Sequence, residues 1–151
     1  MPGAAGDAAR ALGETLDLLE GELRARRVTL ERSGTPEEAL PVRLDNESLK
    51  QIFLNLILNA LEAMVEGGRL TLTTGERRGR AEVSVTDTGP GMPAETLRQL
   101  GQPFHTTKAQ GSGLGLFLTR RLVQSGGGTL TIESEVGRGT TCTVRLPRRK
   151  G

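Results

Sequence analysis

The chain has 151 residues, a length that suits one domain with a single core. It is 35% hydrophobic and 25% charged, with a net charge of +2, three Phe, and neither Trp nor Tyr. Scattered charges without interleaved aromatic residues argue against nucleic-acid binding. No apolar run is long enough to span a bilayer. The single cysteine, Cys142, excludes an internal disulfide and suits a reducing compartment, so we expect a cytoplasmic location.

Hydrophobic periodicity predicts the order of the secondary-structure elements. Residues 1–7 are expected to be a disordered or cloning-derived start, 8–148 the domain, and 149–151 a basic tail. We expect helices over 7–26, from Asp45 or Asn46 to Gly67-Gly68, and over 114–124, with a helical turn near 94–100. Strands are expected over 28–31, 42–44, 69–74, 81–86, 129–134 and 140–146, the last four forming two hairpins. Helices mixed with antiparallel strands predict an α+β fold, a two-layer α/β sandwich with the helices on one face of the sheet.

The central helix contains an unusual polar stripe. Between Ile52 and Val65 only Asn55, Asn59 and Glu62 are polar, and their spacing places them on one side of a helix. Asn is a weak helix former and costs free energy when its hydrogen-bonding groups are buried without partners. Two interpretations remain open for the Asn pair. It either caps a loop beside a core helix, or lines a ligand site with carboxamide oxygens facing a cation.

Three glycine-containing segments follow this helix. In Asp87-Thr88-Gly89-Pro90-Gly91-Met92, a carboxylate at the end of a strand could accept a hydrogen bond from the amino group of a base. In Pro103-Phe104-His105-Thr106-Thr107-Lys108, the lysine could meet phosphate as a point charge. Gly111-Ser112-Gly113-Leu114-Gly115-Leu116 opens the last helix, where backbone amides and the helix dipole can hold phosphate. Alone, each segment could equally be an ordinary turn, a solvated lysine or a helix start. The sequence contains no P-loop, dinucleotide fingerprint or Cys/His metal cluster.

The order NLILNALEAM, DTGPGM, PFHTTK, GSGLGL and GRGTTCTVRLP resembles the catalytic, ATP-binding domain of two-component sensor histidine kinases. These belong to the GHKL superfamily of Bergerat-type ATPases, which includes gyrase-like and chaperone ATPases. The Thr-Thr-Lys segment is most similar to the nitrogen-regulation class. The resemblance runs from about Ala8 to Pro147. It implies a mixed sheet of about five strands with three helices on one face, and a nucleotide beneath a lid from about Met92 to Gly111.

The resemblance also implies the cofactors, ATP and Mg2+, and a set of site residues. Asn59 and Lys108 would be the catalytic residues, Asn59 as the Mg2+ ligand and Lys108 near the terminal phosphate. Asp87 would accept the adenine amino group, and Asn55 would support the phosphates. The other nucleotide-binding positions would be Gly89 and Gly91 beside the base, Gly111, Ser112, Gly113, Leu114, Gly115 and Leu116 around the phosphates, and Thr141 reaching adenine through water.

The implied function is donation of the γ-phosphate to a histidine on a separate dimerisation hairpin, with a response regulator downstream. We expect this chain to be monomeric and its parent homodimeric, with membrane attachment of the parent left open. No such hairpin precedes Ala8, and His105, the only histidine, is expected to be a lid residue. Cys142, where a phenylalanine is common, is expected to be a small buried hydrophobe. The alternatives are an anti-sigma-factor-type serine kinase and a nucleotide-binding interaction module without phosphotransfer.

Overall fold

The computed structural model describes residues 5–35, 37–99 and 113–149. Its main sheet has five strands in the order β2-β4-β5-β7-β6. These strands are β2 (Val28–Gly34), β4 (Gly68–Arg77), β5 (Arg80–Asp87), β6 (Thr129–Glu135) and β7 (Gly139–Pro147). β2 and β4 are parallel, and the other neighbouring pairs are antiparallel. This is the mixed sheet of about five strands that the family resemblance implies.

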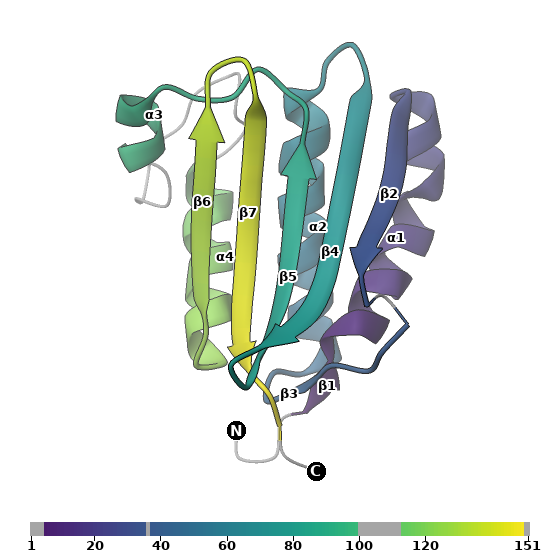
Figure 1. Cartoon of the computed structure of the whole chain (residues 1–151), viewed down its shortest axis with the longest axis vertical. Helices are drawn as coiled ribbons and strands as arrows, with labels where there is room; N and C mark the ends of the chain where they lie inside the picture. Colours follow the sequence, from purple (N-terminus) through teal and green to yellow (C-terminus); the bar gives the residue numbers. More distant parts are fainter. Residues whose placement is uncertain (1–4, 36, 100–112, 150–151) are drawn as a thin grey trace.

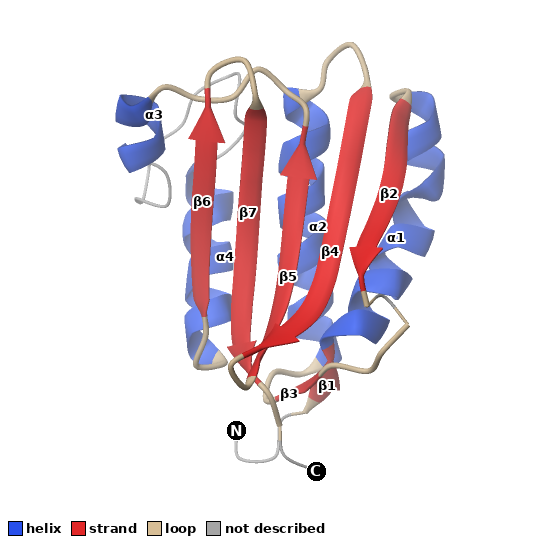
Figure 2. Ribbon diagram, in the orientation of Figure 1, coloured by secondary structure: helices blue, strands red, loops and turns tan. Residues whose placement is uncertain are grey.

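Three helices lie on the same face of the sheet: α1 (Ala8–Ala25), α2 (Asn46–Ala63) and α4 (Gly113–Ser125) (Figure 1). The short helix α3 (Ala94–Gln99) lies beside β6, and no described helix covers the opposite face (Figure 2). The predicted α+β sandwich is therefore confirmed. Among the described residues, no helix combines the length and apolar character needed to cross a bilayer.

The core lies between α2 and the sheet. Leu49, Ile52, Phe53, Ile57 and Leu61 of α2 are all 0% exposed. Alternate strand residues face this helix, and those that are buried include Leu70, Leu72, Val83, Val85, Val144 and Leu146. Fully burying one such side chain contributes about 1.5–3 kcal/mol. Because Phe53 is the one buried Phe among the described residues, most of the stabilisation comes from the many aliphatic side chains.

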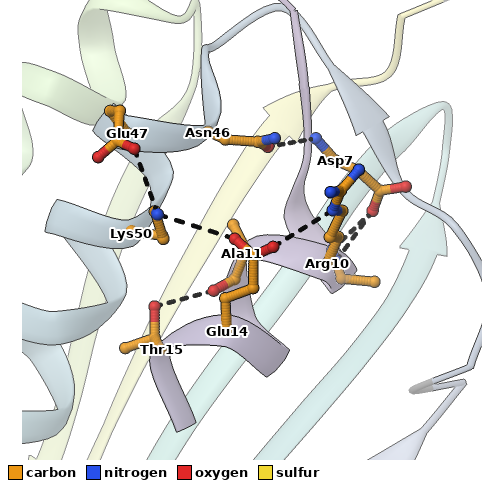
Figure 3. A network of polar contacts seen from close by, with 9 residues as sticks. Asp7, Arg10, Ala11, Glu14, Thr15, Asn46, Glu47 and Lys50 are labelled. Carbon is orange, nitrogen blue, oxygen red and sulfur yellow. Dashed lines mark hydrogen bonds and ion pairs between the residues drawn. The ribbon is translucent and has the colours of Figure 1, made fainter. Parts of the chain in front are cut away.

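The start of α1 is fixed by the side chain of Asp7. Its Oδ1 accepts hydrogen bonds from the backbone N–H groups of Ala9 (2.9 Å), Arg10 (3.2 Å) and Leu40 (3.0 Å). The Asp7 N–H in turn donates to Asn46 Oδ1 at 3.0 Å, which connects the first turns of α1 and α2 (Figure 3). An N-cap aspartate of this kind satisfies helix N–H groups that have no partner within the helix.

Two expectations for this end of the domain are wrong. Gly6 and Asp7, which the sequence assigns to a disordered start, form strand β1 (Gly6–Asp7). β1 pairs with β3 (Pro41–Val42) in a separate two-stranded sheet, so the strand expected over 42–44 is shifted and lies outside the main sheet. Two-residue strands have no periodicity that a sequence pattern could reveal.

Helix α2 begins as predicted and ends one turn earlier. Asp45 accepts hydrogen bonds from the Ser48 N–H (3.0 Å) and hydroxyl (2.8 Å), and these bonds lower the pKa of Asp45. The helix ends at Ala63, with Met64 as its C-cap. The chain then reverses through Gly67 and Gly68, whose φ angles are 91° and 153°, into β4.

Candidate functional site

A cavity lies between the C-terminal half of α2 and the end of the sheet where β5 ends and β7 begins, the upper end in Figure 1. Its volume is about 700 Å³, counting the mouth that is open to solvent. The walls are mainly apolar and come from both layers: Leu56, Ala60, Ala63, Val85, Leu116 and Ile132. Such a concave apolar cavity with a few polar groups is the usual form of a small-molecule site.

Asp87, the last residue of β5, is the carboxylate of this cavity. It is 5% exposed, and its Oδ1 accepts a hydrogen bond from the Gly89 N–H at 2.8 Å. Burial raises the pKa of Asp87 above its ordinary value, while backbone N–H groups of Gly89 and Thr140 act in the opposite direction. The cavity therefore presents a buried acceptor beside apolar walls.

The segment after Asp87 is held against the turn between β6 and β7. Gly91 has a φ of 75°, and a Cβ there would lie 2.0 Å from the Glu135 carbonyl oxygen. The Gly137 N–H donates to the Pro90 carbonyl at 2.8 Å. At Gly89, a Cβ would lie about 3 Å from Asp87 Oδ1 and from Ala63. Both glycines thus permit a close approach of chain segments within the protein, in addition to any approach by a ligand.

The two asparagines of α2 lie in different surroundings. Asn59 lines the cavity that contains Asp87. Asn55 instead donates from Nδ2 to Thr119 Oγ1 of α4 at 3.1 Å, and the Thr119 hydroxyl donates to the Gly115 carbonyl at 2.8 Å. Asn55 therefore connects α2 to α4 and does not line the cavity. Glu62, at the end of the predicted polar stripe, is exposed.

The chain matches proteins of known family along most of its length. Residues 44–150 match the sequence profile of the family described as histidine kinase-, DNA gyrase B-, and HSP90-like ATPase. The chain belongs to this ATPase family.

Similar proteins place this ATPase domain among the histidine kinases. Sporulation kinase C of Bacillus subtilis (strain 168) is 38% identical over 136 residues, which are 90% of this chain and 32% of that protein. Sensor histidine kinase ZraS of Escherichia coli (strain K12) is 36% identical over 137 residues, which are 90% of this chain and 29% of that protein. The chain thus spans about a third of the curated relatives that it matches. The catalytic domain of histidine kinase ThkA superimposes with a TM-score of 0.86 at 30% identity, covering 98% of this chain and 97% of that one.

In this ATPase domain, the threonine that lines the cavity is not the one that the family resemblance implies. Thr140 lines the cavity. The Thr141 side chain lies on the other face of the sheet, where its hydroxyl is 3.0 Å from that of Thr86 on β5. Side chains alternate between the faces of a strand, so a shift of one residue exchanges the cavity for solvent. Thr141 is therefore not brought to the site, and Thr140 takes its place in the cavity wall.

Several cavity residues of the ATPase domain were not singled out from the sequence as site residues. Cys142 lines the cavity, two residues after Thr140 on β7. Met92 and Ile132 line the same cavity. Burial, together with the nearby Asp87 carboxylate, raises the pKa of the Cys142 thiol to about 12, and Arg120 acts in the opposite direction. The thiol is therefore neutral at physiological pH and acts as a small apolar group. Its alternation with Val144 and Leu146 was the signal that could have placed it on this face.

The phosphate side of the predicted site is described only in part. Leu116 lines the cavity from α4, and the Gly115 carbonyl is occupied by the Thr119 hydroxyl. Gly113 and Leu114 belong to the first turn of α4. Lys108, Gly111 and Ser112 lie outside the described residues, as does His105.

Proposed function

We propose that this chain is the ATP-binding catalytic domain of a sensor histidine kinase, which binds Mg-ATP and donates the γ-phosphate to a histidine on a separate segment. The observation that carries the proposal is the buried Asp87 carboxylate at the end of an apolar cavity whose α2 wall contains Asn59. Adenine has two apolar faces and an exocyclic amino group, so it matches a narrow apolar site with an acceptor at one edge. ShkA, whose full-length structure was solved in complex with AMPPNP, covers 98% of this chain with a TM-score of 0.83 at 27% identity, and this supports the choice of nucleotide.

Each described residue of the cavity has a role in this proposal. Asp87 accepts a hydrogen bond from the adenine amino group, and Val85, Leu56 and Ile132 contact the faces of the ring. Magnesium prefers oxygen ligands and keeps several waters, so it often binds through one or two protein groups and the phosphates of a substrate. The carboxamide oxygen of Asn59 fits that requirement. Among the described residues, no three His, Cys, Asp or Glu side chains form a metal site of their own. The ion would supply positive charge that offsets the charge of the phosphates.

The transfer step depends on positioning more than on covalent chemistry of the protein. Lys108 and the glycines from Gly111 to Gly115 remain the residues that we expect around the phosphates. The acceptor histidine would belong to a helical dimerisation hairpin of the parent kinase, and a response regulator would receive the phosphoryl group from it. ThkA was solved in complex with the response regulator TrrA, which supports the second step. The free Cys142 supports a location in the reducing cytoplasm, where thiols stay reduced.

Replacing Asp87 with Asn tests the adenine-binding role. The substitution turns one acceptor oxygen into a donor facing the adenine amino group. A mismatched buried polar pair costs about 1–3 kcal/mol, so we expect ATP affinity measured by calorimetry to fall by roughly tenfold to a hundredfold.

Asp17→Asn is the matched control, because Asp17 is an exposed aspartate on α1. It removes the same charge and should leave the ATP affinity unchanged. If Asp87→Asn binds ATP as tightly as the unmodified chain, Asp87 does not contact the base. If the unmodified chain shows no ATP binding at all, the proposed function itself fails.

A further inference from the structure

Ser134 of β6 joins three segments that meet at the cavity. Its Oγ accepts a hydrogen bond from the Met92 N–H at 2.8 Å, across 42 residues of sequence. The Ser134 hydroxyl donates to the Gly139 carbonyl oxygen at 3.0 Å. It also lies 2.8 Å from the hydroxyl oxygen of Thr140. Met92 and Thr140 both line the cavity, so this one side chain connects two of its walls.

These three contacts fix the direction of the bond between Ser134 and Thr140. A serine hydroxyl has one hydrogen to donate and two lone pairs to accept with. The hydrogen of Ser134 goes to the Gly139 carbonyl, and one lone pair is used by the Met92 N–H. Only the second lone pair remains for Thr140, so Thr140 must be the donor in the 2.8 Å contact. The hydroxyl hydrogen of Thr140 is thereby turned toward Ser134, and its free lone pair is left for the cavity.

The edge of the cavity then presents two acceptors. Thr140 is paired with Asp87 across β5 and β7, and both side chains face the cavity. An amino group of a base at this edge can donate to these acceptors, directly or through a bridging water. A carbonyl oxygen in the same place would face only acceptors.

We propose that Ser134 is a positioning residue for base selection: it holds Thr140 as a hydrogen-bond acceptor toward the cavity and anchors Met92 beside it. The ligand class is a purine with an exocyclic amino group at position 6. This inference rests on the proposed function, because it assumes that the base of a nucleotide occupies the cavity.

A purely structural role for Ser134 makes a different prediction. If the hydroxyl only braced the turn between β6 and β7, its loss would lower the melting temperature and weaken all nucleotides equally. A positioning role changes the choice between bases. ATP and ITP separate the two roles, because inosine replaces the 6-amino donor of adenosine with a 6-oxo acceptor and keeps the same triphosphate.

The experiment is a comparison of ATP and ITP dissociation constants for the unmodified chain and Ser134→Ala. Without Ser134, the Thr140 hydroxyl can rotate and donate to the 6-oxo group. We expect ATP affinity to fall by about fivefold to tenfold, the range for one lost hydrogen-bond partner, and the preference for ATP over ITP to fall by a similar factor. Ser134→Thr keeps the hydroxyl and should restore the preference.

Two further variants keep the test decisive. Ser84→Ala is the matched control, because the Ser84 hydroxyl lies 3.1 Å from that of Thr143 on the opposite face of the sheet, and it should leave the preference unchanged. Thr140→Val removes the acceptor itself and should reduce the preference as Ser134→Ala does, which covers the case in which Ser134→Ala does not fold. An unchanged ATP-to-ITP preference in either Ser134→Ala or Thr140→Val, whether ATP binding is normal or weakened, would overturn the inference while leaving the proposed function intact.

Discussion

At the scale of the residue, Asp87 shows a conflict between stability and binding. The chain buries this carboxylate without a cation beside it among the described residues, and burial raises its pKa. A carboxyl group with a raised pKa in the folded state holds its proton more readily there than in the unfolded chain. The free energy of unfolding therefore falls as pH rises through the interval between the two pKa values. The same charge is the acceptor on which adenine binding would depend.

This conflict predicts opposite effects of Asp87→Asn on stability and on ATP binding. The melting temperature of the variant minus that of the unmodified chain should increase as the pH is raised from about 3 to about 7. The reason is that only the unmodified chain acquires the buried charge. The difference in melting temperature should level off below pH 3.8, the ordinary pKa of an aspartate carboxyl group. Thermal unfolding in a series of buffers measures this, with Asp17→Asn as the control. A difference that stays constant over this range would show that the charge of Asp87 has no cost in the folded state.

Residue patterns predicted some of the site and missed the rest for identifiable reasons. Asn59 and Asp87 stand out because an Asn in an apolar helix and an acid at the end of a strand need partners. The choice between Thr140 and Thr141 depends on which strand face is buried, and two adjacent threonines leave that open to a sequence pattern. The sequence does not indicate Ser134 as a site residue, because its proposed positioning role depends on a contact with Met92, 42 residues away in the sequence.

At the scale of the element, the β4–β5 hairpin contains a backbone conformation that its sequence does not favour. Its two-residue turn is Arg78-Gly79, with φ angles of 55° and 77°. Positive φ at both positions is typical of a type I′ turn, for which Asn-Gly is strongly preferred. A long side chain in the left-handed region costs about 1–2 kcal/mol, and Asn tolerates this region better.

Arg78→Asn should therefore raise the free energy of unfolding by about 0.5–1 kcal/mol, which urea denaturation can measure. Arg138→Asn makes the same chemical change in the exposed turn between β6 and β7. Among the described non-glycine residues, only Arg27 and Arg78 have positive φ, so no gain is expected at Arg138. Equal effects of the two substitutions would mean that backbone conformation is not the cause.

The elements that were predicted are those stabilised by local pattern. Both long hairpins and the helices α1, α2 and α4 follow from periodicity, with glycines in the hairpin turns and after α2 and α4. The full length of β2 does not, because its last residues, Ser33 and Gly34, are extended by parallel pairing with Thr73 and Thr74 of β4. That pairing crosses over the whole of α2, and no signal within residues 28–34 indicates it.

At the scale of the whole molecule, the proposed function raises the question of which histidine accepts the phosphoryl group. The chain contains one histidine, His105, in the segment that the family resemblance identifies as the lid. Phosphoryl transfer requires an acceptor nitrogen in line with the γ-phosphate, at about 3–3.5 Å from the reacting atom. His105 is only a few residues from Gly111, within the segment expected to cover the nucleotide. We therefore expect the acceptor histidine to come from another segment, as in the proposed function.

The resulting prediction is that this 151-residue chain binds ATP without phosphorylating itself. Incubation with γ-labelled ATP and Mg2+ should leave it unlabelled, because transfer needs an in-line acceptor nitrogen and we expect His105 to be a lid residue. Adding a separately prepared phosphoacceptor hairpin of the parent kinase should place label on that hairpin. The label should be lost in acid, as phosphohistidine is, and retained in base.

His105→Ala should support the same transfer, which separates a lid residue from an acceptor. Acid-labile label on the chain alone, abolished by His105→Ala, would instead make His105 the acceptor, and acid-stable label on an added partner would favour a serine kinase.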